Sequence, residues 1–280
     1  MPGGFPTLQG ICGGVSYTTN NNVYVTLGGI SFSASASANT KGSWTQYTAS
    51  TTQDCCLIDI VMGYRVVATG RNQGSMDIGI GASGSEGVII QALTCSGMGD
   101  TYSYARYVFP INIPVGTRIA VRGQASGTTG TGNIYVAIAT YDGFYEQCDG
   151  YAGVDAIGFN NAATQGTTLT PIASGSVKGS YAQLIASTTR DYAGFFAIMD
   201  QQNTSQGNAE SFLFDIAVGA AGSEQIIVPN AGIFSYDACQ PQGHYLPIKI
   251  PAGTRISARC INSDAAVTPT MGLTLYGLYQ

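Results

Sequence analysis

Acidic and basic residues that could perform acid–base chemistry recur in the same order in the two halves of the 280-residue chain. Each half has an aspartate, a glutamate and two arginines, and these residues are Asp77, Glu86, Arg118 and Arg122, then Asp215, Glu224, Arg255 and Arg259. Two carboxylates beside arginine side chains could form a general acid–base site. An enzyme seldom needs one site twice, whereas a duplicated fold keeps its own ion pairs and turn contacts in both copies. We therefore interpret these residues as structural pairs and expect no enzymatic activity.

A glycine-rich stretch, GIGASG at 79–84, matches the G-x-G-x-x-G pattern of dinucleotide-binding loops. That chemistry needs a helix directly after the loop, because the helix N-terminus holds the pyrophosphate. The next residues, SEGVII at 85–90, have the composition of a strand, and Ala217 replaces the first glycine in the second half. The stretch therefore predicts a hairpin connection between two strands.

The single histidine, His244, would have to serve any catalytic triad or multi-histidine metal site. Tyr107 occupies the matching position in the first half, so we interpret His244 as a loop or edge residue. The densest acidic group could bind Ca²⁺ through its oxygens, and it consists of Asp142, Glu146, Asp149 and Asp155. Its spacing fits no EF-hand loop, so we interpret it as solvated linker charge and expect no metal and no cofactor.

Aromatic residues gather in the segments that precede a recurring proline-containing motif, and they are Tyr102, Tyr104, Tyr107, Phe109, Tyr236 and Tyr245. Exposed tyrosine is common on surfaces that contact proteins or carbohydrates. The core and edges of a β-sandwich use the same residues, so both interpretations stay open.

An internal duplication sets the positions of all these residues. The motif IPVGTRIAVR at 113–122 returns as IPAGTRISAR at 250–259, an offset of 137 (250 − 113). KGS at 41–43 and ASTTQD at 49–54 return with the same offset, as KGS and ASTTRD. An offset of this length is the size of a complete domain. The chain is therefore two copies of one fold.

The recurring motif predicts a tight turn followed by a strand. Pro114 suits the entry to a turn because it cannot donate to a β-ladder, and Gly116 and Gly253 can adopt a positive φ. Side chains alternate along a strand, so Arg118 and Arg122 should lie on one face of the strand that follows.

Both copies consist of short runs of β-branched and aromatic residues bounded by glycine, asparagine, serine and proline, without helical periodicity. Such a pattern favours a sandwich or jelly roll. The sequence predicts an all-β fold of two tandem jelly-roll-like β-sandwich domains, preceded by an N-terminal arm at 1–14, with the domains at 15–143 and 144–280. The expected strands are 23–27, 30–34, 43–49, 57–67, 75–80, 87–93, 104–111, 117–124 and 133–141, then 167–172, 181–186, 195–199, 211–218, 225–228, 245–250, 254–260 and 271–279.

Charge and hydropathy exclude two kinds of partner. The net charge is −5 with 11 basic residues that form no cluster, so the electrostatic footprint of a nucleic-acid-binding protein is missing. The N-terminus has no signal-peptide pattern, and no apolar run approaches the length of a membrane span. We expect neither nucleic acid nor membrane as a partner.

The seven cysteines do not recur between the copies, as a shared disulfide framework would require. Their odd number and the absence of a signal predict free thiols in a reducing compartment. In a strand, the adjacent Cys55 and Cys56 would point to opposite faces.

The combination DIxxGAxGSE, then an apolar strand, then IPxGTRIxxR resembles a group of tailed-bacteriophage virion proteins, over about 41–141 and 178–279. The resemblance implies a jelly-roll virion component that is made in the host cytoplasm, and it transfers no catalytic residue. The chain lacks the heptad stalk or collagen-like stretch of a long tail fibre.

These observations lead to one expected function and one alternative. We expect a capsid decoration or cement protein that binds the major capsid protein, reinforces the shell and forms a homo-oligomer such as a trimer. The alternative is a tail-associated receptor-binding or fibre protein that recognises host surface glycans. A depolymerase would need a carboxylate pair in a groove, and the chain offers none outside the duplicated set.

Overall fold

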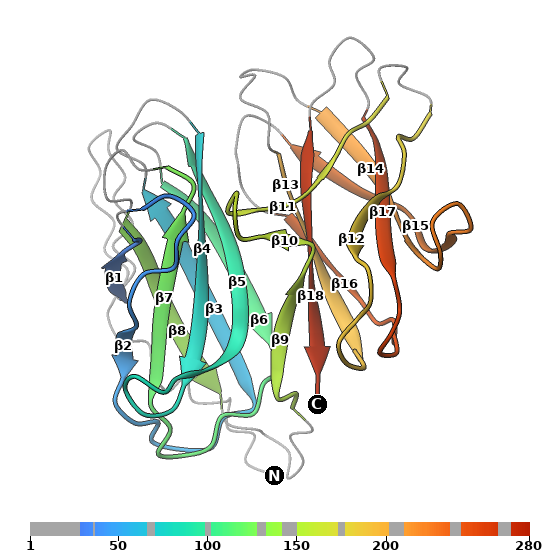
Figure 1. The fold of residues 1–280 in the computed structure, drawn as a ribbon. Helices are drawn as coiled ribbons and strands as arrows, with labels where there is room; N and C mark the ends of the chain where they lie inside the picture. Colours follow the sequence, from blue (N-terminus) through green and yellow to red (C-terminus); the bar gives the residue numbers. More distant parts are fainter. Residues whose placement is uncertain are drawn as a thin grey trace, which may run out of the picture. The chain divides into compact units, whose positions relative to one another are not determined.

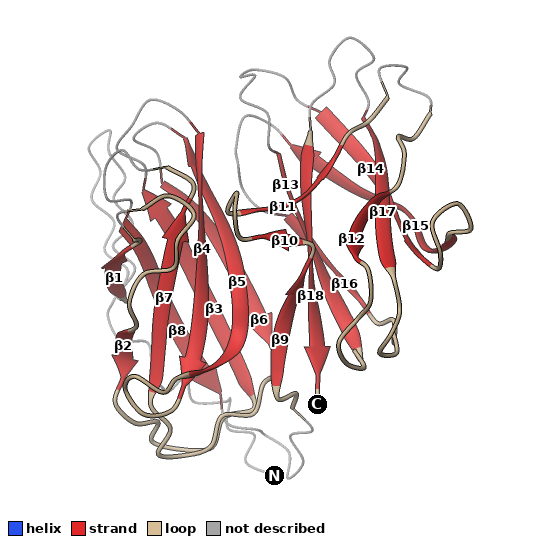
Figure 2. Ribbon diagram, viewed as in Figure 1, coloured by secondary structure: helices blue, strands red, loops and turns tan. Residues whose placement is uncertain are grey.

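The computed structural model describes residues 29–35, 37–65, 71–98, 102–127, 133–141, 150–172, 177–201, 210–235, 242–262 and 270–280. Regular structure in these ranges consists of strands, and Figure 2 shows no helix in them. The chain forms two compact units and passes from one to the other between Gly153 and Val154 (Figure 1). Each unit is described separately below.

The first unit is a jelly roll of two four-stranded antiparallel sheets. Its strands are β1 (Ile30–Ser33), β2 (Thr45–Thr48), β3 (Leu57–Arg65), β4 (Arg71–Ile80), β5 (Gly87–Met98), β6 (Tyr102–Phe109), β7 (Ile119–Ala125) and β8 (Asn133–Tyr141). One sheet has the order β1-β8-β3-β6, and the other has β5-β4-β7-β2. This division of eight strands between two sheets is the jelly-roll arrangement.

The second unit repeats this strand order. Its corresponding strands are β11 (Gln165–Leu169), β12 (Ala182–Ile185), β13 (Gly194–Gln201), β14 (Glu210–Val218), β15 (Gln225–Ser235), β16 (Gln242–Leu246), β17 (Ile256–Asn262) and β18 (Met271–Tyr279). Its sheets are β11-β18-β13-β16 and β12-β17-β14-β15, in the same order as in the first unit. The chain is therefore an all-β protein of two tandem jelly rolls that arose by internal duplication.

Apolar side chains at alternate positions of the strands form a core between the two sheets of each unit. In β3, Ile58, Ile60, Met62 and Tyr64 are buried, as the period of two in a strand requires. In the second unit, Phe212 and Phe214 of β14 are fully buried in the same way. The residues that alternate with these core positions along the strands lie on the outer face of the sheet.

Most predicted strands are present, with shifted ends. The predicted strand at 245–250 lies at Gln242–Leu246, because Pro247 cannot donate to a ladder. The strand predicted to end at 228 continues through Pro229 to Ser235, which proline tolerates because β15 is at the edge of its sheet.

Two strands were not predicted, and they are β9 (Gly153–Ile157) and β10 (Phe159–Asn160). They lie between the recurring motifs, where no matching copy supported a prediction. The expected strand at 23–27 and the arm at 1–14 lie outside the described residues, so both stay predictions. The expected boundary between 143 and 144 also lies outside them, and the division of the chain into compact units falls ten residues later, after Gly153.

Candidate functional site

Asp77 on β4 accepts hydrogen bonds from three different segments of the first unit. Arg122 on β7 donates from Nε to Oδ2 at 2.9 Å, and Lys41 donates from Nζ to Oδ1 at 2.8 Å. The backbone N–H of Ala92 donates to Oδ1 at 2.8 Å. Ala92 has a φ of 49°, and the β4–β5 register is irregular opposite it, so the carboxylate satisfies the N–H of a β-bulge. We call Lys41, Asp77, Ala92 and Arg122 the aspartate clamp.

The second unit contains the same clamp, built from Lys178, Asp215, Asn230 and Arg259. Arg259 Nε donates to Asp215 Oδ2 at 3.0 Å, the Asn230 N–H donates to Oδ1 at 2.9 Å, and Lys178 Nζ donates to Oδ1. Burial opposes ionisation of Asp215, but the hydrogen bonds from Lys178, Asn230 and Arg259 outweigh burial and lower the pKa of the carboxyl. In the first unit, burial lowers the pKa of Lys41 against the opposing effect of Asp77.

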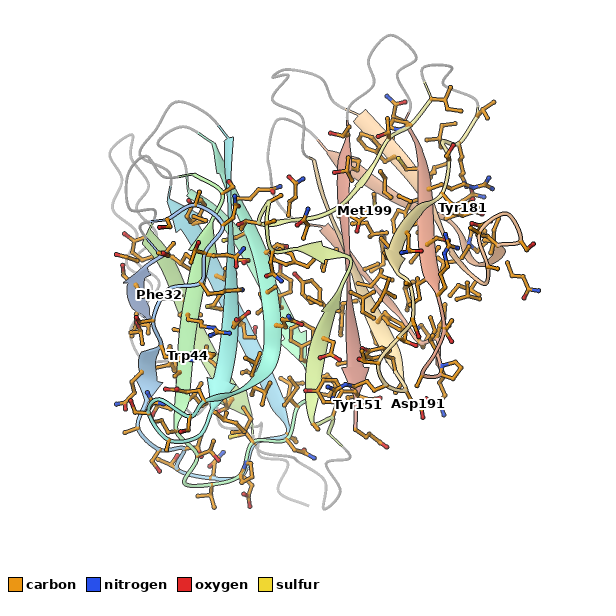
Figure 3. The ribbon with its side chains drawn as sticks, viewed as in Figure 1. Phe32, Trp44, Tyr151, Tyr181, Asp191 and Met199 are labelled. Atoms are coloured by element: carbon orange, nitrogen blue, oxygen red, sulfur yellow. The ribbon has the colours of Figure 1, made fainter. Side chains whose placement is uncertain are left out.

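An aromatic ring lies against the arginine of each clamp. The guanidinium carbon of Arg122 lies 4.5 Å from the ring centroid of Trp44, and that of Arg259 lies 4.6 Å from that of Tyr181. These are cation–π distances, and the two aromatic residues directly precede β2 and β12 (Figure 3). A Cβ atom on Gly79 would lie 2.7 Å from the Trp44 ring. Contact with the Trp44 ring therefore explains why residue 79 is a glycine. The second copy has the smaller ring of Tyr181 in place of Trp44, and it has Ala217 at the position of Gly79.

The second ion pair of each unit fixes the hairpin after β4 or β14. Arg118 Nη1 donates to Glu86 Oε1 at 2.8 Å and to the Gly81 carbonyl at 3.2 Å, while Glu86 Oε2 accepts from the Gly84 N–H at 2.9 Å. These bonds outweigh desolvation and lower the pKa of Glu86. The segment 81–86 joins two strands, which confirms the predicted hairpin connection.

Arg255 repeats these contacts in the second unit. Its Nη1 donates to Glu224 Oε1 at 3.2 Å and to the Gly219 carbonyl at 2.9 Å. Glu224 Oε2 accepts from the Gly222 N–H at 2.9 Å. The arrangement of backbone and side-chain donors is thus the same in both copies.

The recurring turn has the expected backbone, with φ of 78° at Gly116 and 82° at Gly253. Thr51 holds this turn, because its Oγ1 donates to the Pro114 carbonyl at 2.7 Å and accepts from the Thr117 N–H at 3.0 Å. Thr188 makes the same two bonds in the second unit. Sequence reasoning did not single out the threonines as turn partners, although their motif recurred at the same offset.

The structure places His244 on β16, which pairs with β13 at the edge of the described sheet. One ring nitrogen of His244 lies 2.6 Å from the Gly232 carbonyl oxygen. Within the described ranges, no group of three or more His, Cys, Asp or Glu residues could hold a metal ion. In the same ranges, no helix has the length and apolar character to cross a membrane.

The interpretation of Asp155 as solvated linker charge was wrong. Asp155 lies in β9, where its Oδ2 is 3.0 Å from Arg190 Nε and accepts a hydrogen bond from the Tyr192 hydroxyl at 2.8 Å. The first copy has Gln53 in place of Arg190, so the duplication gave no indication of this pair. The other three residues of the acidic group lie outside the described residues.

The prediction that the cysteines are free thiols was wrong for Cys56, which is disulfide-bonded. Cys55, Cys95 and Cys260 are free and buried, so the partner of Cys56 lies outside the described residues. The lack of recurrence excluded a disulfide shared by both copies, but it could not exclude one formed in a single copy. Burial raises the pKa of the Cys260 thiol to about 12, which makes it unreactive.

The aromatic residues divide between core and surface. Tyr107 and Phe109 are buried and stack on each other with centroids 6.1 Å apart. Tyr245 is 50% exposed and packs against Phe196 at 4.9 Å. Nothing is described for the side chains of Tyr102 and Tyr104, or for residue 236.

No protein-family model and no curated protein matches the chain. Among solved structures, it is similar to PNGF-II at 11% identity and a TM-score of 0.42, with 90% of this chain and 64% of that chain covered. A chain in the structure of Broad Bean Stain Virus is similar at 8% identity and a TM-score of 0.34, with 89% of this chain and 92% of that chain covered. Tandem CBM22 domains of Paenibacillus barcinonensis Xyn10C match at 10% identity and a TM-score of 0.27, with 85% and 92% covered. The chain spans less than two thirds of the PNGF-II chains.

Proposed function

We propose that the chain is a non-enzymatic structural protein of a tailed-bacteriophage virion, and that it decorates the capsid and reinforces the shell. The observation that carries this proposal is the use of the recurring charges. In both units the carboxylates that could act as acid or base hold a β-bulge and a hairpin instead. A duplicated scaffold with internally paired charges suits a protein that binds neighbours through its surface.

The proposed partner is the major capsid protein, and a homo-oligomer such as a trimer would match the symmetry of a shell. Residues 1–14 are proposed as an arm that anchors the chain to a neighbouring subunit. Deleting this arm should abolish incorporation into particles while the two jelly rolls still fold. Unchanged incorporation would exclude the anchor.

The copy number of the chain in purified particles tests the capsid proposal. Quantitative mass spectrometry, normalised to the major capsid protein, should find on the order of hundreds of copies, as one chain or trimer per shell position requires. A few copies would place the chain on the tail, and absence from the particle would refute a virion function.

A tail-associated receptor-binding function is the second candidate, and the exposed ring of Tyr245, which packs against the half-buried Phe196, favours it. Aromatic faces of this kind stack on sugar rings and on other apolar surfaces. Tyr245→Ala should then reduce adsorption of the purified protein to host cells. Val115→Ala is the control, since it shortens another exposed apolar side chain that carries no aromatic ring.

A further inference from the structure

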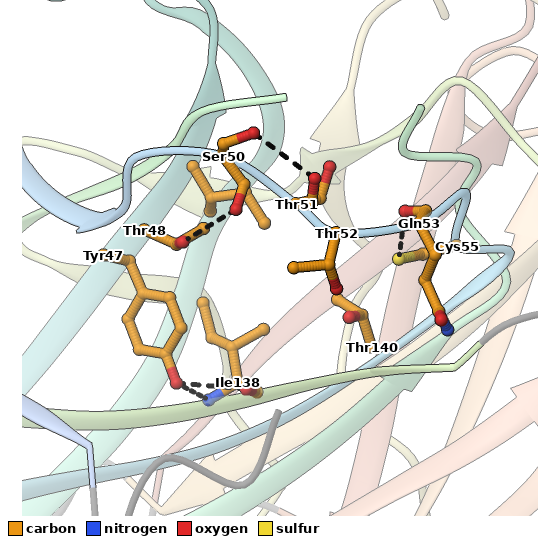
Figure 4. Close-up of a pocket in the computed structure, with 10 residues that line it drawn as sticks. Tyr47, Thr48, Ser50, Thr51, Thr52, Gln53, Cys55, Ile138 and Thr140 are labelled. Carbon is orange, nitrogen blue, oxygen red and sulfur yellow. Dashed lines mark hydrogen bonds between the residues drawn. The ribbon is translucent and has the colours of Figure 1, made fainter. Parts of the chain in front are cut away.

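A pocket of about 280 Å³ opens in the first unit beside β2, β7 and β8 (Figure 4). The segment 48–55 forms one side, and the rings and branched side chains of Tyr47, Ile119 and Ile138 form an apolar wall. None of the ten residues that line it is charged. Its volume is roughly nine times that of one water in the liquid, about 30 Å³.

Some polar groups of the pocket already have partners. The Tyr47 hydroxyl donates to the Ile138 carbonyl at 3.0 Å and accepts from the Ile138 N–H at 2.8 Å. Thr51 is engaged with the turn at Pro114. These bonds fix the ring of Tyr47 and the path of the segment, so the walls of the pocket are preformed.

Other polar groups of the lining are unused. The Nε2 atom of Gln53 is buried, and it has no hydrogen-bond partner among the described residues. The Thr52 and Thr140 hydroxyls also line the pocket, and no hydrogen bond of theirs occurs within the described part of the chain. A buried amide nitrogen without a hydrogen-bond partner is rare in folded proteins and needs an explanation.

The second unit provides an internal comparison, because its equivalent position is filled. Tyr192 replaces Cys55, and both residues form the same isolated bridge, to Ile250 and Ile113 respectively. Tyr192 is 2% exposed, and a Cβ atom on Gly277, the counterpart of Thr140, would lie 2.6 Å from its ring. The jelly-roll fold therefore does not require the pocket.

We propose that this pocket binds a neutral, hydroxyl-bearing ring about the size of one sugar residue. The amide and the two threonine hydroxyls match the donors and acceptors of ring hydroxyls, while the apolar wall matches the C–H face of the ring. A charged ligand would lose its hydration without gaining an ionic partner among the described residues of the lining. The proposal does not rest on attachment to a capsid, and incorporation into particles is expected to be independent of it.

Saturation-transfer NMR on the full chain tests the proposal, with neutral methyl hexosides and N-acetylhexosaminides as probes and glucuronate and glucosamine as charged counterparts. We expect at least one neutral probe to bind with a Kd on the order of 1 mM. Gln53→Met keeps the size of the side chain and removes the donor, so it should weaken binding about tenfold. Cys55→Tyr with Thr140→Gly reproduces the filled arrangement and should abolish binding.

Thr52→Val removes one of the threonine hydroxyls and should also weaken binding, whereas Thr189→Val, the same change at the corresponding position of the second unit, is its matched control and should leave the affinity unchanged. Failure of every neutral probe to bind the unaltered chain would overturn the proposal. Binding that persists in the folded double variant, or equal binding of the charged counterparts, would also overturn it. If the double variant does not fold, an unchanged affinity in Gln53→Met has the same meaning.

Discussion

Replacing Asp77 with alanine removes the central group of the first aspartate clamp. The change removes the carboxylate to which Lys41, Arg122 and the Ala92 N–H donate hydrogen bonds. Removing one partner of a fully buried ion pair costs about 3–5 kcal/mol. Lys41 and Arg122 retain 20% and 30% exposure of their side chains, so water partly replaces the carboxylate. We expect Asp77→Ala to lower the free energy of unfolding by about 2–3 kcal/mol.

Urea denaturation at neutral pH measures this loss, and the fluorescence of Trp44 reports it locally. Trp44 is the only tryptophan in the chain and lies against Arg122 of the clamp. Asp54→Ala is the control, because Asp54 accepts one hydrogen bond, from the exposed Val115 N–H at 2.8 Å. Its loss should cost about 0.5–1 kcal/mol.

The prediction is tested by comparing the loss of unfolding free energy in Asp77→Ala with the loss in Asp54→Ala. If Asp77→Ala destabilised the first unit no more than Asp54→Ala does, the clamp would contribute nothing beyond an exposed hydrogen bond. The explanation that both copies keep these charged residues because they stabilise the fold would then be wrong.

Three further predictions concern packing, pH and the disulfide. Gly79→Ala should cost about 1–3 kcal/mol through contact with the Trp44 ring, and Trp44→Tyr in the same chain should restore most of it in urea unfolding; no restoration would refute the packing explanation. The folded-state pKa of Asp215 is lowered, so its contribution to stability is complete above the unfolded pKa of about 3.9 and is lost as the pH falls through the folded value. The stability difference between the unaltered chain and Asp215→Asn should therefore narrow below about pH 4, and a constant difference would contradict this sign. Cys56→Ser should lower the free energy of unfolding by about 2–4 kcal/mol without reductant and make no difference with it; equal stability without reductant would mean that the disulfide does not stabilise the fold.

The duplication made the fold predictable from the sequence to a large extent. The strands β8 and β18 were predicted with the observed ends, and they occupy corresponding positions in the two copies. Strand ends were wrong where a local rule competed with pairing. β15 continues beyond Pro229 because an edge strand tolerates proline and because Asn230 adopts a positive φ in the bulge.

The candidate site was predictable only where both copies share it. The carboxylates and arginines were found by recurrence, but their partners in space, such as the Ala92 N–H, depend on a bulge that no sequence pattern announced. Asp155 pairs with Arg190 across 35 positions in one copy only, and the pocket beside Gln53 exists because Cys55 is smaller than Tyr192. Features that distinguish the copies therefore required the structure.

The aspartate clamp also bears on how long the folded state survives once it has formed. Its three bonds join Asp77 to groups that are 15, 36 and 45 residues away in the chain. The two longer contacts, to Lys41 and Arg122, require the closure of large loops before they can form. Interactions that are absent from the folding transition state slow unfolding without speeding folding. We therefore expect the clamp of each jelly roll to slow unfolding more than it speeds folding, so that the folded state persists even at a modest equilibrium stability.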